Sequence, residues 1–98
     1  MERAEIEVQG LIWDERNEAK LAAHGVSPED VEAVLNNAPR FFVNLPGRSA
    51  DCMMLGPDDK GRFFFVPMIP TSKKGIWYVV TAYRLERRRA LKLYEGGD

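Results

Sequence analysis

The stretch that decides the fold is WDERNEAKLAAHGVS, residues 13–27, which contains the signals for one helix and the start of another. Asp14 is a favoured N-cap, because its carboxylate can accept hydrogen bonds from the free N–H groups of a first helical turn. Gly25 suits the left-handed position that follows many helices. The dipeptide Ser27-Pro28 supplies the cap and first residue of a second helix. The stretch therefore predicts a helix over about 14–24 and another directly after it.

A polar stripe runs along the first predicted helix. Asn17, Lys20 and His24 recur at three- and four-residue spacing and so share one helix face. His24 is the only histidine of the chain, and histidine exchanges a proton near neutral pH. The stripe is therefore a candidate site. The alternatives are that His24 stabilises the helix C-terminus or joins a buried hydrogen-bond network, and that Lys20 pairs with a neighbour such as Glu18.

The chain after residue 40 changes from helical to strand character. Apolar and β-branched runs separated by short polar turns predict strands at residues 41–43, 51–55, 62–68 and 76–83. Strands joined by short loops are antiparallel. Helical periodicity returns at about 86–94. We therefore expect a single α+β domain over residues 1–98, in which two N-terminal helices pack on a four-stranded antiparallel sheet and a C-terminal helix follows. Residues 5–8 are expected to form a short strand or an arm.

Composition excludes several classes of protein. Hydrophobic residues make up 45% and charged residues 30% of the 98 residues, as in an ordinary globular domain. No apolar run approaches the roughly 20 residues of a membrane span, and the N-terminus lacks the features of a signal peptide. With one cysteine and one histidine, we expect no disulfide, no metal and no cofactor. The expected compartment is the cytoplasm.

Charge is divided unevenly between the two parts of the chain. Residues 1–59 carry five basic and twelve acidic side chains, whereas residues 60–98 carry nine basic and three acidic ones. Such a division predicts a surface for a polyanion, or alternatively a domain whose two parts pair their charges with each other. Arg87, Arg88, Arg89 and Lys92 form the densest basic segment, which is typical of a strip that contacts phosphates.

Two segments resemble the BrnT-like ribonuclease toxins of bacterial type II toxin–antitoxin systems. The first is within the stretch 13–27 quoted above. The second is VTAYRLERR, residues 80–88, together with Tyr94, which is similar to the C-terminal motif of that family. Gly56 and Gly61-Arg62 match the family's sheet turn. The resemblance covers about residues 12–94, and the matching residues of the first segment are Trp13, Asp14, Asn17, Lys20, His24, Gly25, Val26 and Ser27.

The resemblance implies a RelE-like fold and a small cytoplasmic endoribonuclease that cleaves RNA without a metal and inhibits translation. The implied partners are RNA and a cognate antitoxin protein. DNA is bound only indirectly, through the antitoxin. A dimer, or a heterotetramer with the antitoxin, is the assembly considered. The expected catalytic residues are Arg84, Tyr83, His24 and Lys20. The expected RNA-binding residues are Arg87, Arg88, Arg48 and Arg62.

These roles follow from what RNA cleavage requires: a base, an acid and cations for the developing phosphorane. Tyr83 can stack a base or transfer a proton, and Arg84 can bind the scissile phosphate through two hydrogen bonds. Arg48 and Arg62 both border turns and are expected to line one groove. The family has arginine where this chain has Tyr83, and the spacing to Tyr94 is longer here. A non-catalytic binding or regulatory module on the same scaffold is therefore the alternative.

Overall fold

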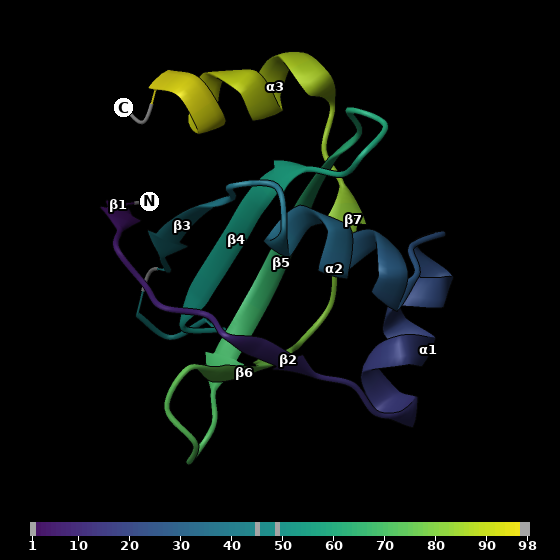
Figure 1. The fold of residues 1–98 in the computed structure, drawn as a ribbon, viewed down its shortest axis with the longest axis vertical. Helices are drawn as coiled ribbons and strands as arrows, with labels where there is room; N and C mark the ends of the chain where they lie inside the picture. Colours follow the sequence, from purple (N-terminus) through teal and green to yellow (C-terminus); the bar gives the residue numbers. More distant parts are fainter. Residues whose placement is uncertain (1, 45, 49, 97–98) are drawn as a thin grey trace.

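The computed structural model describes residues 2–44, 46–48 and 50–96 (Figure 1). The helical segments are α1 (Glu15–Ala23), α2 (Pro28–Leu35) and α3 (Arg87–Leu91), which continues into a π-helical turn, η1 (Lys92–Gly96). The strands are β1 (Glu2–Ala4), β2 (Gly10–Ile12), β3 (Arg40–Val43), β4 (Cys52–Pro57), β5 (Phe63–Pro70), β6 (Ile76–Val79) and β7 (Tyr83–Arg84). No helix in the described ranges has the length and apolar character needed to cross a bilayer.

The strands form one mixed sheet, which corrects the expected topology. In the described ranges the sheet has seven strands. Six of them follow the order β1-β3-β4-β5-β6-β2, and the seventh, β7, pairs with β5. Strand β2 runs parallel to β6, whereas the other pairs are antiparallel. The expectation of two helices on a four-stranded antiparallel sheet, as in RelE-type toxins, is therefore wrong.

The two N-terminal strands explain part of this difference. Residues 5–8, expected as a strand or arm, are not a strand; β1 and β2 lie on either side of them instead. Each of these strands has only three residues and lies at an outer edge of the sheet. Alternation of polar and apolar residues is too short a signal over three positions to reveal such edge strands.

A proline divides the last expected strand into two. Residues 76–83 were expected to form one strand, but they form β6 and β7 with a gap between them. Pro67 lies opposite this gap, where its carbonyl oxygen accepts a hydrogen bond from the Val80 N–H at 2.9 Å. Because proline has no N–H to donate in return, the ladder cannot continue past this point. The missing donor ends β6 and lets the chain rejoin β5 as β7.

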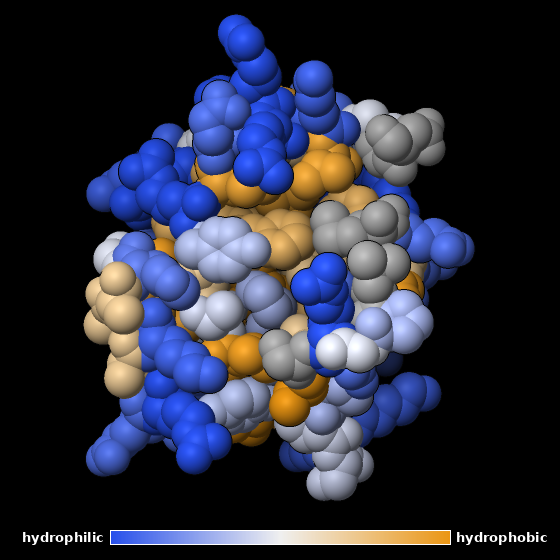
Figure 2. Space-filling model, turned by 180° about the vertical axis from the view of Figure 1, so that it is seen from behind, coloured by the Kyte–Doolittle hydropathy of each residue, from blue (hydrophilic) through white to orange (hydrophobic). Residues whose placement is uncertain are grey.

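The sheet carries a hydrophobic core on each face. On one face, α1 and α2 and the segment that joins β1 to β2 cover a cluster that includes Leu21, Val31 and Phe64 (Figure 1). On the other face, the C-terminal helical segment covers a second cluster that includes Phe42, Leu55 and Ala90. Figure 2 shows this second side, where hydrophobic surface is visible between charged side chains.

The predicted helix signals are confirmed. Asp14 caps α1, and its side chain accepts a hydrogen bond from the Asn17 N–H. Ser27 and Asp30 form a reciprocal capping box at the start of α2. Gly25 has the positive φ of 71° that the sequence predicted. These caps fix the turn between α1 and α2 and so set where His24 lies.

Candidate functional site

The end of α1 lies beside the strand β7, and this brings His24 and Tyr83 together. The two rings meet edge to face, with 5.9 Å between their centroids and 74° between their planes. Both side chains are exposed. The imidazole Nδ1 lies 3.1 Å from the carbonyl oxygen of Ala82 and 3.4 Å from the hydroxyl oxygen of Thr81. The structure therefore joins two residues that are 59 positions apart in the sequence.

The contact with Ala82 determines the form of the imidazole. A carbonyl oxygen only accepts hydrogen bonds, so Nδ1 must be the donor. In the neutral ring the other nitrogen, Nε2, then carries a free lone pair. The ring of His24 contacts Ala82 and Thr81 rather than the carbonyl groups at the end of α1, so of its two structural alternatives the hydrogen-bond network is the one found, in a partly exposed position. A histidine oriented by a backbone carbonyl, with Nε2 free, has the arrangement of a general base.

Asn17 holds the helix that carries His24 against the sheet. Its side chain is fully buried, and Nδ2 donates to the carbonyl oxygens of Ile12 at 2.9 Å and Val79 at 3.0 Å. Its Oδ1 accepts from the Asp14 N–H at 2.8 Å. Asn17 therefore ties the start of α1 to β2 and β6. The stripe of Asn17, Lys20 and His24 thus includes one buried anchor and two exposed residues.

Tyr83 and Arg84 lie on opposite faces of the sheet. Tyr83 pairs with Phe65 in the ladder, and their ring centroids lie 5.7 Å apart. Arg84 pairs with Phe64, whose side chain lies in the core beneath α1 and α2. Because consecutive strand residues point to opposite faces, the expected catalytic set is divided. His24 and Tyr83 are in contact, with Lys20 exposed one turn earlier on the same helix face, whereas Arg84 points to the face of the sheet on which α1 and α2 pack.

Arg62 is committed to a structural role. Its Nη2 lies 2.6 Å from Asp58 Oδ2 and 3.0 Å from Asp30 Oδ1, and its Nε also donates to Asp58. Burial alone would raise the pKa of Asp58, but hydrogen bonds from the backbone and side chain of Arg62 outweigh it and lower that pKa. Arg62 therefore joins the turn before β5 to α2 and has little capacity left for RNA.

The positions of Arg48 and Arg62 correct the expectation of a shared groove. Arg48 is exposed in the turn before β4, whereas Arg62 follows the end of that strand. The six residues of β4 separate them by about 20 Å at the usual rise of a strand. A groove of about 500 Å³ instead brings Arg62 together with Arg84 and Arg87.

The basic helix is not neutralised by the acidic part of the chain. Among the described residues, the ion pairs are those of Arg62 with Asp30 and Asp58. Arg87 donates to the carbonyl oxygen of Gly61 at 3.0 Å, and Arg88 is exposed on α3. The alternative in which the two parts of the chain pair their charges is therefore met, among the described residues, at Arg62.

Metal and thiol chemistry find no support in the described residues. No group of three His, Cys, Asp or Glu side chains converges there. Cys52 is buried in the core, and burial raises the pKa of its thiol to about 11. Since the thiolate is the reactive form, Cys52 is a packing residue rather than a nucleophile.

Some contacts of the site have no signal in the sequence. Thr81 lies beside His24, but nothing local distinguishes it from other strand threonines. Arg40 lies over the ring of Tyr94, 4.6 Å from its centroid, although the two are 54 positions apart. Only the folded topology reveals such pairs.

Comparison of the chain with protein-family models, with curated proteins and with solved structures found no match. The class that the geometry itself defines is an α+β domain with an oriented, exposed histidine next to a tyrosine and a free basic helix.

Proposed function

We propose that the protein is a small metal-independent endoribonuclease, the toxin of a type II toxin–antitoxin module. The observation that carries this proposal is the exposed His24, whose Nδ1 is bound to the Ala82 carbonyl so that Nε2 is available as a base. Its neighbour Tyr83 offers a partly exposed ring on which an unpaired RNA base can stack.

In the proposed reaction, Nε2 of His24 takes the proton from a ribose 2′-hydroxyl. The 2′-oxygen then forms a bond to the adjacent phosphorus as the bond from phosphorus to the 5′-oxygen breaks. The leaving 5′-oxygen is protonated by Tyr83 or by water, and the products are a 2′,3′-cyclic phosphate and a free 5′-hydroxyl. No metal is needed, because the base is a side chain and cations can stabilise the developing charge.

The cations come from two directions in this proposal. Lys20 lies one helical turn before His24 and is exposed. Arg84 and Arg87 share a groove at the start of α3, and Arg88 extends the basic surface along that helix. Because Arg84 lies on the other face of the sheet from Tyr83, it is assigned to a flanking phosphate rather than to the scissile one.

The proposed cellular setting is a cytoplasmic complex with a cognate antitoxin. An antitoxin that covers the basic helix and His24 would block access of RNA and would connect the toxin to operator DNA. The complex would be a dimer or a heterotetramer. The sign of the surface fits this role, since the arginines of α3, which form no ion pair among the described residues, are complementary to an acidic or polyanionic partner.

A second candidate function is a non-catalytic binding or regulatory module. It is favoured by the placement of Tyr83 and Arg84 on opposite faces of the sheet and by the commitment of Arg62 to two carboxylates. Such a module would keep RNA binding on the basic helix but would have no need for a free Nε2.

Expression of the chain in a bacterial host tests the proposal. The wild-type protein is expected to arrest growth, and His24→Ala is expected to relieve the arrest because it removes the base. Glu18→Ala is the matched control, since it alters an exposed side chain of the same helix. Equal thermal unfolding of the two variants shows that folding is unaffected.

Two results would decide against this function. Unimpaired growth on expression of the folded wild-type chain would favour the non-catalytic module. Arrest that persists in the His24→Ala variant would mean that toxicity does not depend on the proposed base.

A further inference from the structure

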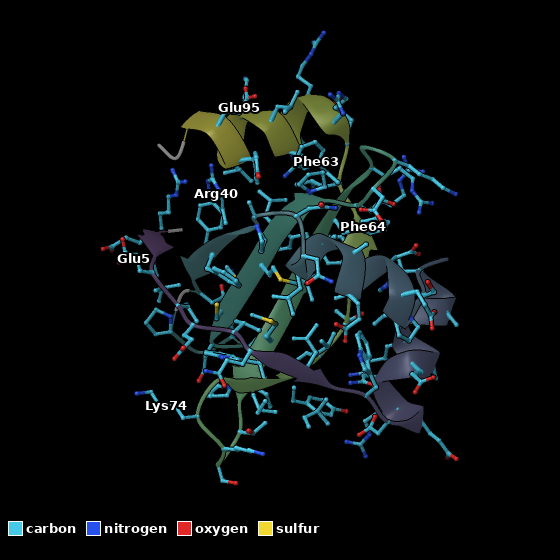
Figure 3. All side chains as sticks on the ribbon, in the orientation of Figure 1. Glu5, Arg40, Phe63, Phe64, Lys74 and Glu95 are labelled. Carbon is cyan, nitrogen blue, oxygen red and sulfur yellow. The ribbon has the colours of Figure 1, made fainter. Side chains whose placement is uncertain are left out.

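A second groove lies at the edge of the sheet, away from His24. It has a volume of about 580 Å³ and lies between β1 with the residues after it and the start of β3. Two arginines, Arg3 and Arg40, and one carboxylate, Glu5, line it. Among the described residues, neither arginine forms an ion pair. Figure 3 shows Arg40 at this edge, close to the C-terminal helical segment, with Glu5 below it. With two arginines and one carboxylate in its lining, the groove carries a net positive charge.

The guanidinium of Arg40 is held in a fixed orientation. Its carbon lies over the ring of Tyr94, 4.6 Å from the ring centroid. Its Nη1 donates to the carbonyl oxygen of Ala38 at 3.1 Å. The Tyr94 hydroxyl donates to the same oxygen at 2.7 Å. One carbonyl thus fixes both the arginine and the aromatic ring beneath it.

The backbone around this carbonyl is unusual. Among the described residues, Ala38 is the one non-glycine residue with a positive φ, which is 49°. Tyr94 itself lies in η1, a π-helical turn. Both conformations are uncommon and tend to occur at functional positions. The chain therefore uses two unfavourable local conformations to orient one arginine.

Arg40 retains an unused donor. Its Nε has no hydrogen-bond partner but is enclosed, so the donors that a ligand in the groove can reach are those of the two Nη nitrogens. Nη1 is the guanidinium nitrogen with a hydrogen bond to a described residue. An arginine that is oriented by stacking and by one hydrogen bond, and that still has donors free, is suited to bind an oxyanion. A structural arginine would be expected to have its partner in place, as Arg62 does.

We propose that this groove is a phosphate subsite, in which Arg40 with Arg3 binds a backbone phosphate of the same RNA strand whose cleavage is assigned to His24. The inference rests on the proposed function. The C-terminal helical segment connects this groove with the groove of Arg84 and Arg87, which is assigned to a flanking phosphate, since Arg87 touches the turn at Gly61 and Tyr94 lies under Arg40. Tyr94 lies seven helical steps after Arg87, which is about 10 Å at 1.5 Å per residue. A stacked strand spans this distance with roughly three nucleotides.

Binding of a 2′-O-methyl hexauridylate tests the subsite without cleavage, because this strand lacks the 2′-hydroxyl nucleophile. Affinity is measured by fluorescence anisotropy over a range of salt concentrations. Arg40→Gln is expected to weaken binding roughly tenfold, the effect of one charge-assisted hydrogen bond. It is also expected to reduce the slope of log affinity against log salt by about 0.7, because one phosphate contact is lost.

The control is Lys74→Gln, which removes an exposed positive charge from the β5–β6 loop, far from Arg40 in Figure 3. It is expected to leave affinity and slope unchanged. Arg40→Lys separates orientation from charge, and it is expected to restore the salt slope but only part of the affinity. Titration of the ¹⁵N-labelled protein with inorganic phosphate should shift the Arg40 Nε–H resonance, whereas a glutamate peptide should not.

The outcomes separate the subsite from the proposed function. Equal affinities for wild type and Arg40→Gln, or equal losses in Arg40→Gln and Lys74→Gln, would overturn the subsite. An equal response of the Arg40 resonance to the glutamate peptide would overturn its assignment to phosphate. If the modified strand binds through Arg40 while unmodified RNA is not cleaved, the subsite stands and the endoribonuclease is wrong. If RNA is cleaved and Arg40→Gln binds like wild type, the endoribonuclease stands and the subsite is wrong.

Discussion

Replacement of Asn17 is expected to be among the most destabilising single changes in this protein. Its side chain is fully buried and satisfies three backbone groups: the carbonyls of Ile12 and Val79 and the N–H of Asp14. Asn17→Ala leaves all three without a partner. A buried polar group that loses its hydrogen bond costs about 1 kcal/mol or more. The expected loss is therefore about 3 kcal/mol.

This magnitude is large relative to the whole. A domain of 98 residues has a free energy of unfolding of roughly 5–15 kcal/mol, so the variant should remain folded at room temperature. Its melting temperature should fall by roughly 15 °C. Urea unfolding followed by circular dichroism measures the change directly. Asn36→Ala is the control, because Asn36 is exposed, and its expected effect is within about 0.5 kcal/mol.

A second variant separates hydrogen bonding from packing. Asn17→Asp keeps the shape but cannot donate to the two carbonyls when ionised, so at pH 7 it should be at least as unstable as Asn17→Ala. Burial should raise the pKa of the new carboxyl, so its penalty should diminish as the pH falls below 7. A loss below about 1 kcal/mol in Asn17→Ala, or a neutral Asn17→Asp, would refute the account of α1 as tied to the sheet by this side chain.

Three further predictions concern other parts of the fold. Hydrogen bonds lower the pKa of Asp58 below its ordinary value of 3.8, so its contribution is fully present above that pH and disappears as the pH falls through the lowered pKa. Asp58→Asn should therefore cost about 2 kcal/mol in urea unfolding at pH 7 and progressively less as the pH falls below 3.8; a cost that does not change with pH would contradict this. Burial raises the pKa of the Cys52 thiol from 9.0 to about 11. The thiol should therefore react with a thiol reagent about a hundredfold more slowly in the folded chain than in urea, and equal rates would contradict its burial. Gly25→Ala meets no atom within 4 Å but has a φ of 71°, so it should lower stability by about 1 kcal/mol through backbone strain alone, and an unchanged melting temperature would refute this.

The parts of the fold predicted correctly are those with local signals. Asp14 and Ser27 are caps whose partners lie three residues away, so the sequence contains both members of each interaction. The sheet could not be predicted in the same way. Strands β1, β2 and β7 have two or three residues each, and their pairing depends on partners far along the chain. The break between β6 and β7 depends on Pro67, which lies on a different strand.

The candidate site shows the same division. The sequence singled out His24 and Tyr83, and the structure brings their rings together. It could not show which face of the sheet Tyr83 and Arg84 each take, because the face of a strand residue depends on the register with β5. Nor could it show that Arg62 is held by Asp30, which is 32 positions away. Residue types indicated the chemistry, but register and pairing decided which side chains meet.

The most direct test of the central claim is the cleavage of single-stranded RNA by the purified chain in the presence of EDTA, with the product ends identified by mass spectrometry. The account predicts cleavage that leaves 2′,3′-cyclic phosphate ends, and loss of that cleavage in a folded His24→Asn variant. Absence of cleavage by the folded wild-type chain, or undiminished cleavage by His24→Asn, would contradict it.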